Sequence, residues 1–406
     1  NEGTKIQNFF TGFKERLKGM SQYWMANLFD PYQLVSNVGN MINKVVELDD
    51  ALVDLKKTTT MSDNELNKFY TNSSKNAKEA GTTTKDFIQQ AADWSRLGYS
   101  SNYEATNMAK KSSKFAAISP GMSTDEASSG LISIMKAYDV GVDQVESQIM
   151  DKINTLGNNF AVTNANVVTG LEKSAAALSS TGTSLEDAMA LFVAGDEILQ
   201  DESSMGTALR TISLRVRGFS EETGELDDNL KTIKGDVIDL TKTAAHPNGV
   251  SLFTDSSQEH YKSLVTYLGE ISDIWDEISE KNQNKLLDKL FGKTRAQAGS
   301  AILTNFDTVR EALAKMETAE GSSDAEMANI QESLSYKINA LKETWTGLLT
   351  TLSRSDFGVI IDGLTGISEL ITTIVGNVGL IQTVLGGAGG LLASKTGLGK
   401  HSFVVV

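Results

Sequence analysis

Cysteine is absent from this chain of 406 residues. Its absence excludes a disulfide framework, a thiolate nucleophile, and zinc-finger or iron–sulfur sites. Histidine is nearly absent too: His246 lies in a predicted turn, His260 in a predicted helix and His401 near the end. No HExxH spacing or similar helical pair of metal ligands occurs. We therefore predict no catalytic residue, no metal site and no cofactor, and expect a protein that is not an enzyme.

Proline is scarce, with only Pro31, Pro120 and Pro247 in the whole chain. Average usage is about 5%, and long helices are the structures that most exclude proline. Basic residues are outnumbered by acidic ones, which gives a formal net charge of −15. Nucleic-acid binding depends on clustered Lys and Arg, so we expect no DNA or RNA partner. The 40% apolar and 22% charged residues are ordinary for a folded globular protein.

Two further signals of enzymatic function fail. Gly292-Lys293-Thr294 resembles the end of a phosphate-binding loop, but that motif needs a glycine at position 287, which is Leu. Carboxylates are abundant in the acidic stretch after residue 218, and nothing in the sequence isolates one in an apolar pocket. They are interpreted as surface residues: Glu221, Glu222, Asp227 and Asp228.

The first predicted unit is a basic amphipathic segment, residues 1–30. Over residues 5–20 apolar side chains recur at three- and four-residue steps, with Lys and Arg on the other face. Such a helix lies on a membrane surface or, more commonly, packs on its own protein. No signal peptide can be assigned here. The start at Asn1 and the apolar end at Val406 indicate an excerpt of a longer chain.

The second unit, residues 31–218, is a predicted core of short helices. Asp30-Pro31 opens a helix to about Leu55. Further starts are marked by capping boxes, in which a Ser hydroxyl and a Glu three residues later satisfy free amides. Gly81 and Gly98 are placed as C-terminal caps, and Pro120-Gly121 as a turn. The predicted boxes are Ser62/Glu65, Ser101/Glu104, Ser123/Glu126 and Ser323/Glu326.

A faint internal duplication lies in this core. Residues 125–130 and 201–206 share Asp-Glu-x-Ser-x-Gly about 76 residues apart. The preceding stretches 87–97 and 168–178 also match loosely. The pattern predicts two helical repeats, with chance similarity as the alternative.

The third unit, residues 219–322, is predicted as an acidic linker with a small hairpin and helices. Residues 219–280 hold 14 acidic and 4 basic residues, which indicates a solvated surface more than a basic partner. The turn at residues 246–249 is flanked by Val237-Ile238 and by residues 250–253. These flanks could pair as a small β-hairpin.

The fourth unit, residues 323–355, carries the clearest periodicity in the chain. Apolar residues recur every seven positions in two series, which indicates a coiled-coil-like helix used for self-association. A core helix of a bundle is the alternative. The stripe consists of Met327, Leu334, Ile338, Leu341, Trp345, Leu348 and Leu352.

The last unit, residues 356–406, contains 25 consecutive uncharged residues from Leu370 to Ser394, more than the roughly 20 that span a bilayer. Six glycines interrupt it, which makes it a poor helix in water. We predict a segment able to enter a membrane, with a buried or helix-packing segment as the alternative. Its predicted contact residues are Leu370, Ile371, Ile374, Val375, Val378, Leu380, Ile381, Val384, Leu385, Leu391 and Leu392. The predicted fold class is therefore mainly α: a multi-helix bundle of short capped helices, a long coiled-coil-like helix and a glycine-rich apolar segment.

The order of these features from about Glu47 to Phe306 resembles the core of bacteriophage tail tape measure proteins of the minor-tail type. Small-residue helices come first, including residues 80–83, 91–100 and 183–188. They are followed by the acidic linker. The more specific pieces are Gly206-Thr207-Ala208-Leu209-Arg210 and Leu290-Phe291-Gly292, the latter within Leu290 to Ala296 after Leu268-Gly269-Glu270-Ile271.

The resemblance implies a virion structural protein, encoded by a phage or prophage and assembled in the host cytoplasm. Several copies would lie inside the tail tube, organise its assembly with other tail proteins, fix its length, and leave ahead of the DNA toward the host membrane. A fully helical chain could encode length at 1.5 Å per residue. The short helices of residues 62–217 look compact, so the measuring part is expected mostly outside this chain. The alternatives are a membrane-active secreted effector, pore-forming or toxin-like, and a cytosolic helical scaffold.

Overall fold

The computed structural model describes residues 47–217 and 230–352, and helices dominate both ranges. The only extended pairing there is an isolated antiparallel bridge between Phe253 and Tyr261. The predicted mainly-α fold is confirmed. After a helical stretch at residues 47–58, the α-helices are α4 (Asp63–Glu79), α5 (Thr84–Arg96), α6 (Asn102–Ala117), α7 (Thr124–Tyr138), α8 (Asp151–Asn159), α9 (Asn164–Ser180), α10 (Leu185–Leu199), α11 (Glu202–Arg215), α12 (Leu230–Leu240), α13 (Leu264–Asp273), α14 (Glu280–Phe291), α15 (Ala296–Thr304), α16 (Phe306–Met316), α17 (Ser322–Glu332) and α18 (Leu334–Leu352).

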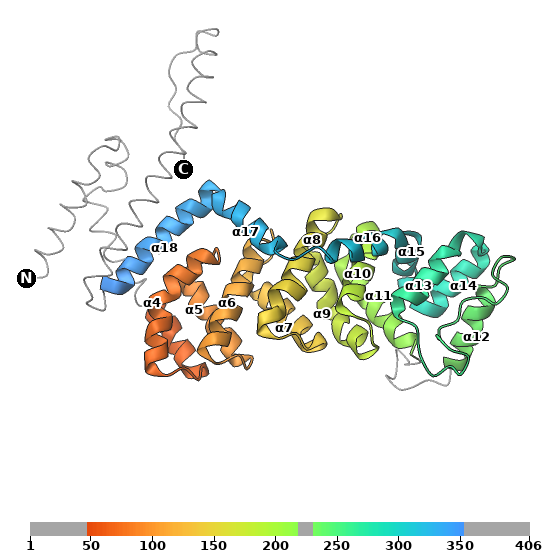
Figure 1. The fold of residues 1–406 in the computed structure, drawn as a ribbon, viewed down its shortest axis with the longest axis horizontal. Helices are drawn as coiled ribbons and strands as arrows, with labels where there is room; N and C mark the ends of the chain where they lie inside the picture. Colours follow the sequence, from red (N-terminus) through yellow and green to blue (C-terminus); the bar gives the residue numbers. More distant parts are fainter. Residues whose placement is uncertain (1–46, 218–229, 353–406) are drawn as a thin grey trace, which may run out of the picture.

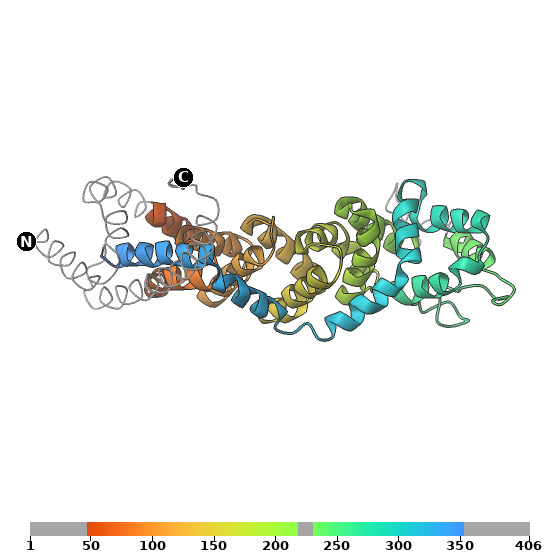
Figure 2. The same cartoon turned by 90° about the horizontal axis from the view of Figure 1, so that it is seen from above.

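The helices stand side by side in a row along the longest axis, from α4 at one end to α12 and α14 at the other (Figure 1). After α15 the chain turns back along this row (Figure 2). On its return α16 packs on α10, α17 on α8 and α6, and α18 on α4. We call residues 47–316 the body and α17 with α18, residues 322–352, the strap.

Local capping chemistry sets many helix starts. The predicted capping boxes at Ser62, Ser101 and Ser123 are confirmed, with both reciprocal hydrogen bonds present at each. A serine hydroxyl that satisfies a free amide stabilises a helix start by about 1 kcal/mol. These contacts span three residues, which explains why the sequence alone predicted them.

Helix ends follow the predicted glycines. Gly81 and Gly98 have φ values of 74° and 101°, in the left-handed region. Each follows the last turn of its helix, and its amide donates to the carbonyl of Lys78 or Ser95. Glycine adopts this conformation without the steric cost of a Cβ, so it stops the helix cleanly.

The predicted turn at Pro120-Gly121 is also confirmed. The Met122 amide donates to the carbonyl of Ser119 at 3.0 Å, and Gly121 has a φ of 86°. Proline at the second position and glycine at the third suit this type of turn. The turn leads directly into the capped start of α7.

The capping box predicted at Ser323 and Glu326 is wrong. Helix α17 begins at Ser322, two residues earlier than this box predicts, and its N-cap residue Gly321 provides no side-chain cap. Ser323 instead donates its amide and its hydroxyl to the carboxylate of Asp151, in the body. A long-range partner thus replaces the local one that the sequence pattern suggested.

The predicted β-hairpin is wrong as well. Val237 and Ile238 lie in helix α12, where Val237 is buried. The turn between residues 246 and 249 does form, closed by the Gly249 amide on the carbonyl of His246 at 3.1 Å. Val250 then donates its amide to the hydroxyl of Thr241. Short β-branched pairs fit either a strand or one face of a helix, and here packing decides for the helix.

The single long helix predicted for residues 323–355 is, over the described residues, two helices that meet at Ser333. Ser333 is extended, with φ −65° and ψ 147°. Its hydroxyl accepts a hydrogen bond from the amide of Tyr336 at 3.2 Å, as an N-cap does. Serine favours an N-cap position over a helix interior. The helix therefore breaks at Ser333, although the seven-residue apolar spacing continues past it.

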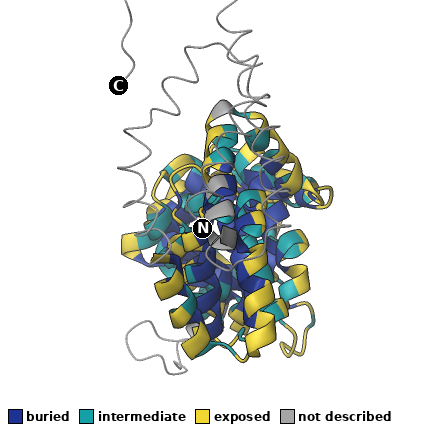
Figure 3. Cartoon of the chain, turned by 90° about the vertical axis from the view of Figure 1, so that its left-hand side faces the viewer, coloured by how far each residue is buried: buried dark blue, intermediate teal, exposed yellow. Residues whose placement is uncertain are grey.

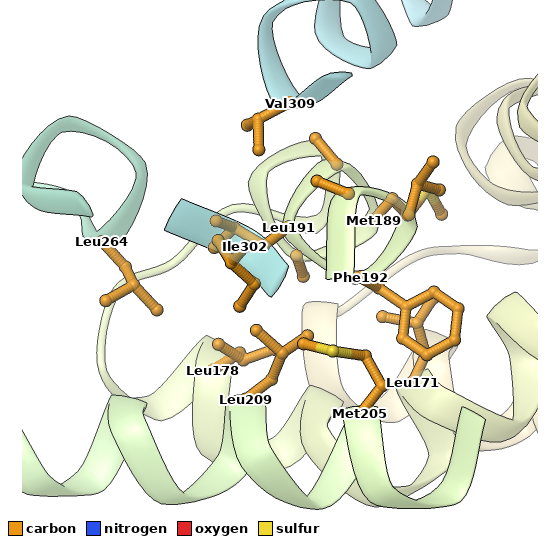
Figure 4. Packing of buried hydrophobic residues seen from close by; sticks show 14 of the residues in the cluster. Leu171, Leu178, Met189, Leu191, Phe192, Met205, Leu209, Leu264, Ile302 and Val309 are labelled. Atoms are coloured by element: carbon orange, nitrogen blue, oxygen red, sulfur yellow. The ribbon is translucent and has the colours of Figure 1, made fainter. Parts of the chain in front are cut away.

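Two apolar clusters fill the row. The smaller one joins the helix at residues 47–58 with α4, α5 and α6, and the larger one runs on through the rest of the body. Seen from the α4 end, buried residues occupy the facing sides of the helices and exposed residues the outer sides (Figure 3). Side chains from α9, α10, α11, α13, α15 and α16 converge in the larger cluster (Figure 4). They include Leu171, Phe192, Met205, Leu209, Leu264, Ile302 and Val309.

The closest backbone approach of this core joins α9 and α11. A Cβ built on Gly206 would lie 2.4 Å from the carbonyl oxygen of Gly170. On the other side of α9, a Cβ on Gly130 would lie 2.1 Å from Val168. Gly130 and Gly206 are the last residues of the two similar six-residue segments, so both segments bring a glycine against α9.

Helices α5 and α9 begin and end in similar ways. Helices α5 and α9 each follow a threonine cap and end at a left-handed glycine, Gly98 or Gly182. Their neighbours differ, because α5 packs chiefly on α6 whereas α9 packs chiefly on α11 and α7. The two-fold repeat therefore stays a prediction.

Candidate assembly surface

The strap interface is the main long-range contact of polar side chains in the described chain. Where α18 crosses α4, the Ser74 hydroxyl donates to the carbonyl oxygen of Glu343 at 2.7 Å. The ammonium of Lys78 donates to the hydroxyl of Thr344 at 3.0 Å. Burial under the strap lowers the pKa of Lys78, because desolvation disfavours its charged form. These contacts join α4, near the start of the described chain, to α18 at its end.

Glu343 also reaches the start of α5. Its carboxylate accepts the backbone amide of Thr84 at 2.7 Å and the Thr84 hydroxyl at 2.6 Å. Helix amino termini leave several amides without intrahelical partners and carry partial positive charge, so they suit an anion. A side chain of the strap thus completes the cap of a body helix.

At α17 the roles are reversed, because a carboxylate of the body accepts hydrogen bonds from the start of a strap helix. Asp151, at the start of α8 in the body, accepts the backbone amides of Gly321 and Ser323, both at 2.9 Å, and the Ser323 hydroxyl at 2.5 Å. Asn154, one turn along α8, donates to the Ser322 hydroxyl at 2.8 Å. Body and strap therefore each supply a carboxylate to the other's helix start.

The residues predicted as a self-association stripe do not share one environment. Met327 is 4% exposed and its side chain lies against Gly81, so it belongs to the chain's own core. Ile338 is 38% exposed and Leu341 is half-buried. The side chains of Leu334, Trp345, Leu348 and Leu352 lie outside the described part of the structure. Among the described residues, α18 meets α4 through the Tyr336 hydroxyl, the Glu343 carbonyl, the Thr344 hydroxyl and Gly347.

The predicted membrane contact residues, Leu370 to Leu392, all lie outside the described residues. Within residues 47–217 and 230–352, no helix is both long and apolar enough to cross a bilayer. The membrane prediction therefore rests on the sequence of residues 370–394.

A buried carboxylate that the sequence analysis did not identify lies at the end of α10. Asp196 is fully buried, and burial raises its pKa to about 6. Hydrogen bonds from the Asn166 side chain at 3.4 Å and the Asp201 amide at 3.1 Å oppose this rise in pKa. The available signal was helical spacing, because Asp196 follows Phe192 by four residues in an apolar run.

Two histidines lie on the surface beside carboxylates. The Nδ1 atom of His246 lies 3.3 Å from Glu277, and that of His260 lies 2.6 Å from Asp255. Asp255 also accepts amide and hydroxyl groups of its own loop, which lowers its pKa to about 2. Among the described residues, no group of three or more His, Asp or Glu side chains could hold a metal ion. The His260 pair lies within one loop, whereas the His246 pair joins a turn to residue Glu277, 31 positions later.

The motifs that carry the family resemblance lie where helices approach most closely. Gly206 lies at the α9–α11 contact, and Leu290 and Phe291 are fully buried. A Cβ on Gly299 would lie 2.2 Å from the ring of Phe291. Gly292 has a φ of 78° and ends α14. In this structure these residues pack helices against one another.

No solved structure matches this chain in a structural comparison. The family model described as phage-related minor tail protein matches residues 74–292, which is more than half of the sequence. The match begins in α4, ends at Gly292 after α14, and includes every helix of the large cluster up to that point. The chain therefore belongs to the family of phage-related minor tail proteins, which places it among the structural proteins of phage tails.

Proposed function

We propose that this chain is part of a tape measure protein, which scaffolds tail-tube assembly and helps to set tail length. The observation that carries the proposal is the elongated row of helices, which suits the inside of a tube (Figure 1). Family membership supplies the tail context. The proposed partners are tube and assembly proteins and further copies of the chain.

Tail length tests the measuring role. Deleting the strap, residues 322–352, shortens the tail by about 45 Å if these residues lie extended as helix, at 1.5 Å per residue. The deletion leaves length unchanged if the strap stays folded on the body inside the tail. Electron micrographs of assembled tails distinguish these results. The matched control replaces the strap with an unrelated helical sequence of equal length and should restore wild-type length, since residue number is what counts.

Unchanged tail length after the strap deletion contradicts a measuring role for this segment. Altered length in the equal-length replacement contradicts measurement by residue number. Either result leaves the tail location untouched, because that conclusion comes from the family.

We further propose that residues 370–394 contact the host membrane when the protein is released to assist genome delivery. The support is their length without charge. The purified chain should float with phosphatidylcholine–phosphatidylglycerol vesicles. Val378→Asp with Ile381→Asp should abolish flotation, because a carboxylate at the centre of a spanning helix costs about 3 kcal/mol. The control pair Thr396→Asp and Ser402→Asp, beyond the segment, should float normally. A wild-type chain that stays with the soluble fraction would favour the cytosolic scaffold.

Self-association is proposed to use the exposed side of α18. Among the stripe side chains that the structure describes, Ile338 is exposed, whereas Met327 is buried within the chain. Ile338→Glu should lower the mass measured by sedimentation without changing thermal stability. Met327→Ala should do the opposite, lowering stability while leaving the mass unchanged. A mass that is unaffected by Ile338→Glu removes α18 from the interface.

A further inference from the structure

The strap and the α16 helix before it are held on the body by different kinds of contact. Helix α16 buries four apolar side chains, each at most 4% exposed: Phe306, Val309, Ala312 and Met316. The buried strap side chains that the structure describes are Ser323, Met327, Ala340, Glu343, Thr344 and Thr346. Apolar burial is the main stabilising contribution to packing, and among the described side chains α16 buries more apolar groups than the strap, where Met327 is in the core and Ile330 and Tyr336 pack against it.

The strap contact is specific in register despite its polarity. Asp151 and Glu343 are 2% and 7% exposed, and their hydrogen-bond partners in the interface are amides and hydroxyls. Burying a carboxylate costs desolvation energy that is recovered only when its donors meet it with good geometry. A one-residue slip would leave both charges without their donors. Such contacts select one position of the strap without adding much strength.

A natural pivot separates the two parts. Gly321 has a φ of 79°, and no described atom lies within 4 Å of a Cβ built on it. It joins the end of the firmly packed return helix to the start of the strap. Rotation at this glycine would move α17 and α18 together once the hydrogen bond from its own amide to Asp151 breaks.

We propose that the strap opens from the body as a unit about Gly321, while the body stays folded. Opening exposes Met327 and the start of α5, and converts a folded-back segment into one that projects from the row. The proposal depends on the contacts of Asp151, Glu343 and Gly321, and holds whether or not the chain measures tail length.

Hydrogen exchange of the full chain tests it. Opening frees the amides of Thr84 and Ser323 together, so both should exchange at least ten times faster than fully buried amides of α9 and α11. Glu343→Gln keeps the side-chain length and removes the charge. It should speed exchange of Thr84 and the strap several-fold and leave α9 and α11 unchanged. Exchange of Thr84 and Ser323 at the rate of the α9 and α11 amides overturns the proposal, as does uniform acceleration across the chain in Glu343→Gln.

A covalent lock gives an independent readout. Because the chain has no cysteine, Ser74→Cys with Gly347→Cys creates a single possible disulfide. A Cβ built on Gly347 lies 2.9 Å from the Ser74 Cβ, so a shift of about 1 Å reaches the usual disulfide spacing of about 3.8 Å. Oxidation should slow strap exchange to the rate of α9 and α11, and reduction should restore it; each single variant is the control. Fast strap exchange in the oxidised form overturns the proposal. If the pair does not oxidise, the native-chain comparison of Thr84 and Ser323 with α9 and α11 decides it.

Discussion

The contact between α9 and α11 should be intolerant of a single methyl group. In Gly206→Ala the new Cβ would lie 2.4 Å from the carbonyl oxygen of Gly170. The Cβ is attached to the backbone of one helix and the oxygen belongs to the backbone of the other. Overpacking a core costs about 1–3 kcal/mol, and a contact between two backbones belongs at the upper end because no rotamer change relieves it. Replacing glycine by alanine inside a helix returns about 1 kcal/mol. The expected net loss is therefore about 2 kcal/mol in the free energy of unfolding.

The matched control is Gly235→Ala. Gly235 lies inside α12, and no described atom comes within 4 Å of its built Cβ. Only the gain in helix propensity applies there, so we expect an increase in stability of about 1 kcal/mol. The same chemical change thus has opposite signs at two helical glycines. Urea unfolding followed by circular dichroism measures both, and at about 2–4 °C per kcal/mol the thermal midpoints should differ clearly.

Gly206→Ala with wild-type or higher stability would refute the close approach of α9 and α11. Loss of stability in Gly235→Ala would instead show that propensity arguments fail in this chain. Hydrogen exchange adds a spatial check, because the amides of α9 and α11 should be affected first in Gly206→Ala.

Two further predictions concern single side chains. Asp196 has its pKa raised to about 6 in the folded state, against about 3.9 when unfolded, so the folded state binds more protons between these values. Its contribution to stability is therefore fully present below about pH 4 and is lost as pH rises through about 6. Asp196→Asn should remove this pH dependence of stability and add about 2 kcal/mol to the free energy of unfolding at pH 7.5. Urea unfolding at pH 5 and 7.5 measures both effects. Equal pH dependence of the variant and the wild type would contradict the burial of this carboxylate. Ser123→Ala should lower the free energy of unfolding by about 1 kcal/mol through loss of the α7 cap. The control Ser257→Ala, in an exposed loop, should change that free energy by less than half as much. Equal effects of the two variants would contradict the capping explanation.

Sequence patterns predicted those features whose causes lie within a few residues. The caps at Ser62, Ser101 and Ser123 each depend on a partner three residues away, and the glycine ends of α4 and α5 depend on one backbone conformation. The mainly-α fold followed from scarce proline and three- and four-residue spacing. Local chemistry decides these features before any tertiary contact forms.

Some contacts that the sequence did not predict come from distant partners that outcompete local ones. Ser323 has a suitable Glu three residues later, yet it bonds Asp151, 172 residues away. Glu343 finds its donor at Thr84, 259 residues away. Nothing in the spacing of either residue encodes such a pairing. The apolar series across Ser333 was real as a pattern, but the serine cap divides the helix that it seemed to describe.

The long separation between Glu343 and Thr84 has a consequence during protein synthesis. Body helices mostly pack on neighbours that are close in sequence, so the row can form progressively as the chain leaves the ribosome. Thr83 caps α5 locally, but the Thr84 amide has to wait for Glu343 until 259 more residues are translated, roughly 13–50 s at about 5–20 residues per second. Throughout that interval water has to satisfy the Thr84 amide. Each newly made chain therefore passes through a strapless stage before it first closes.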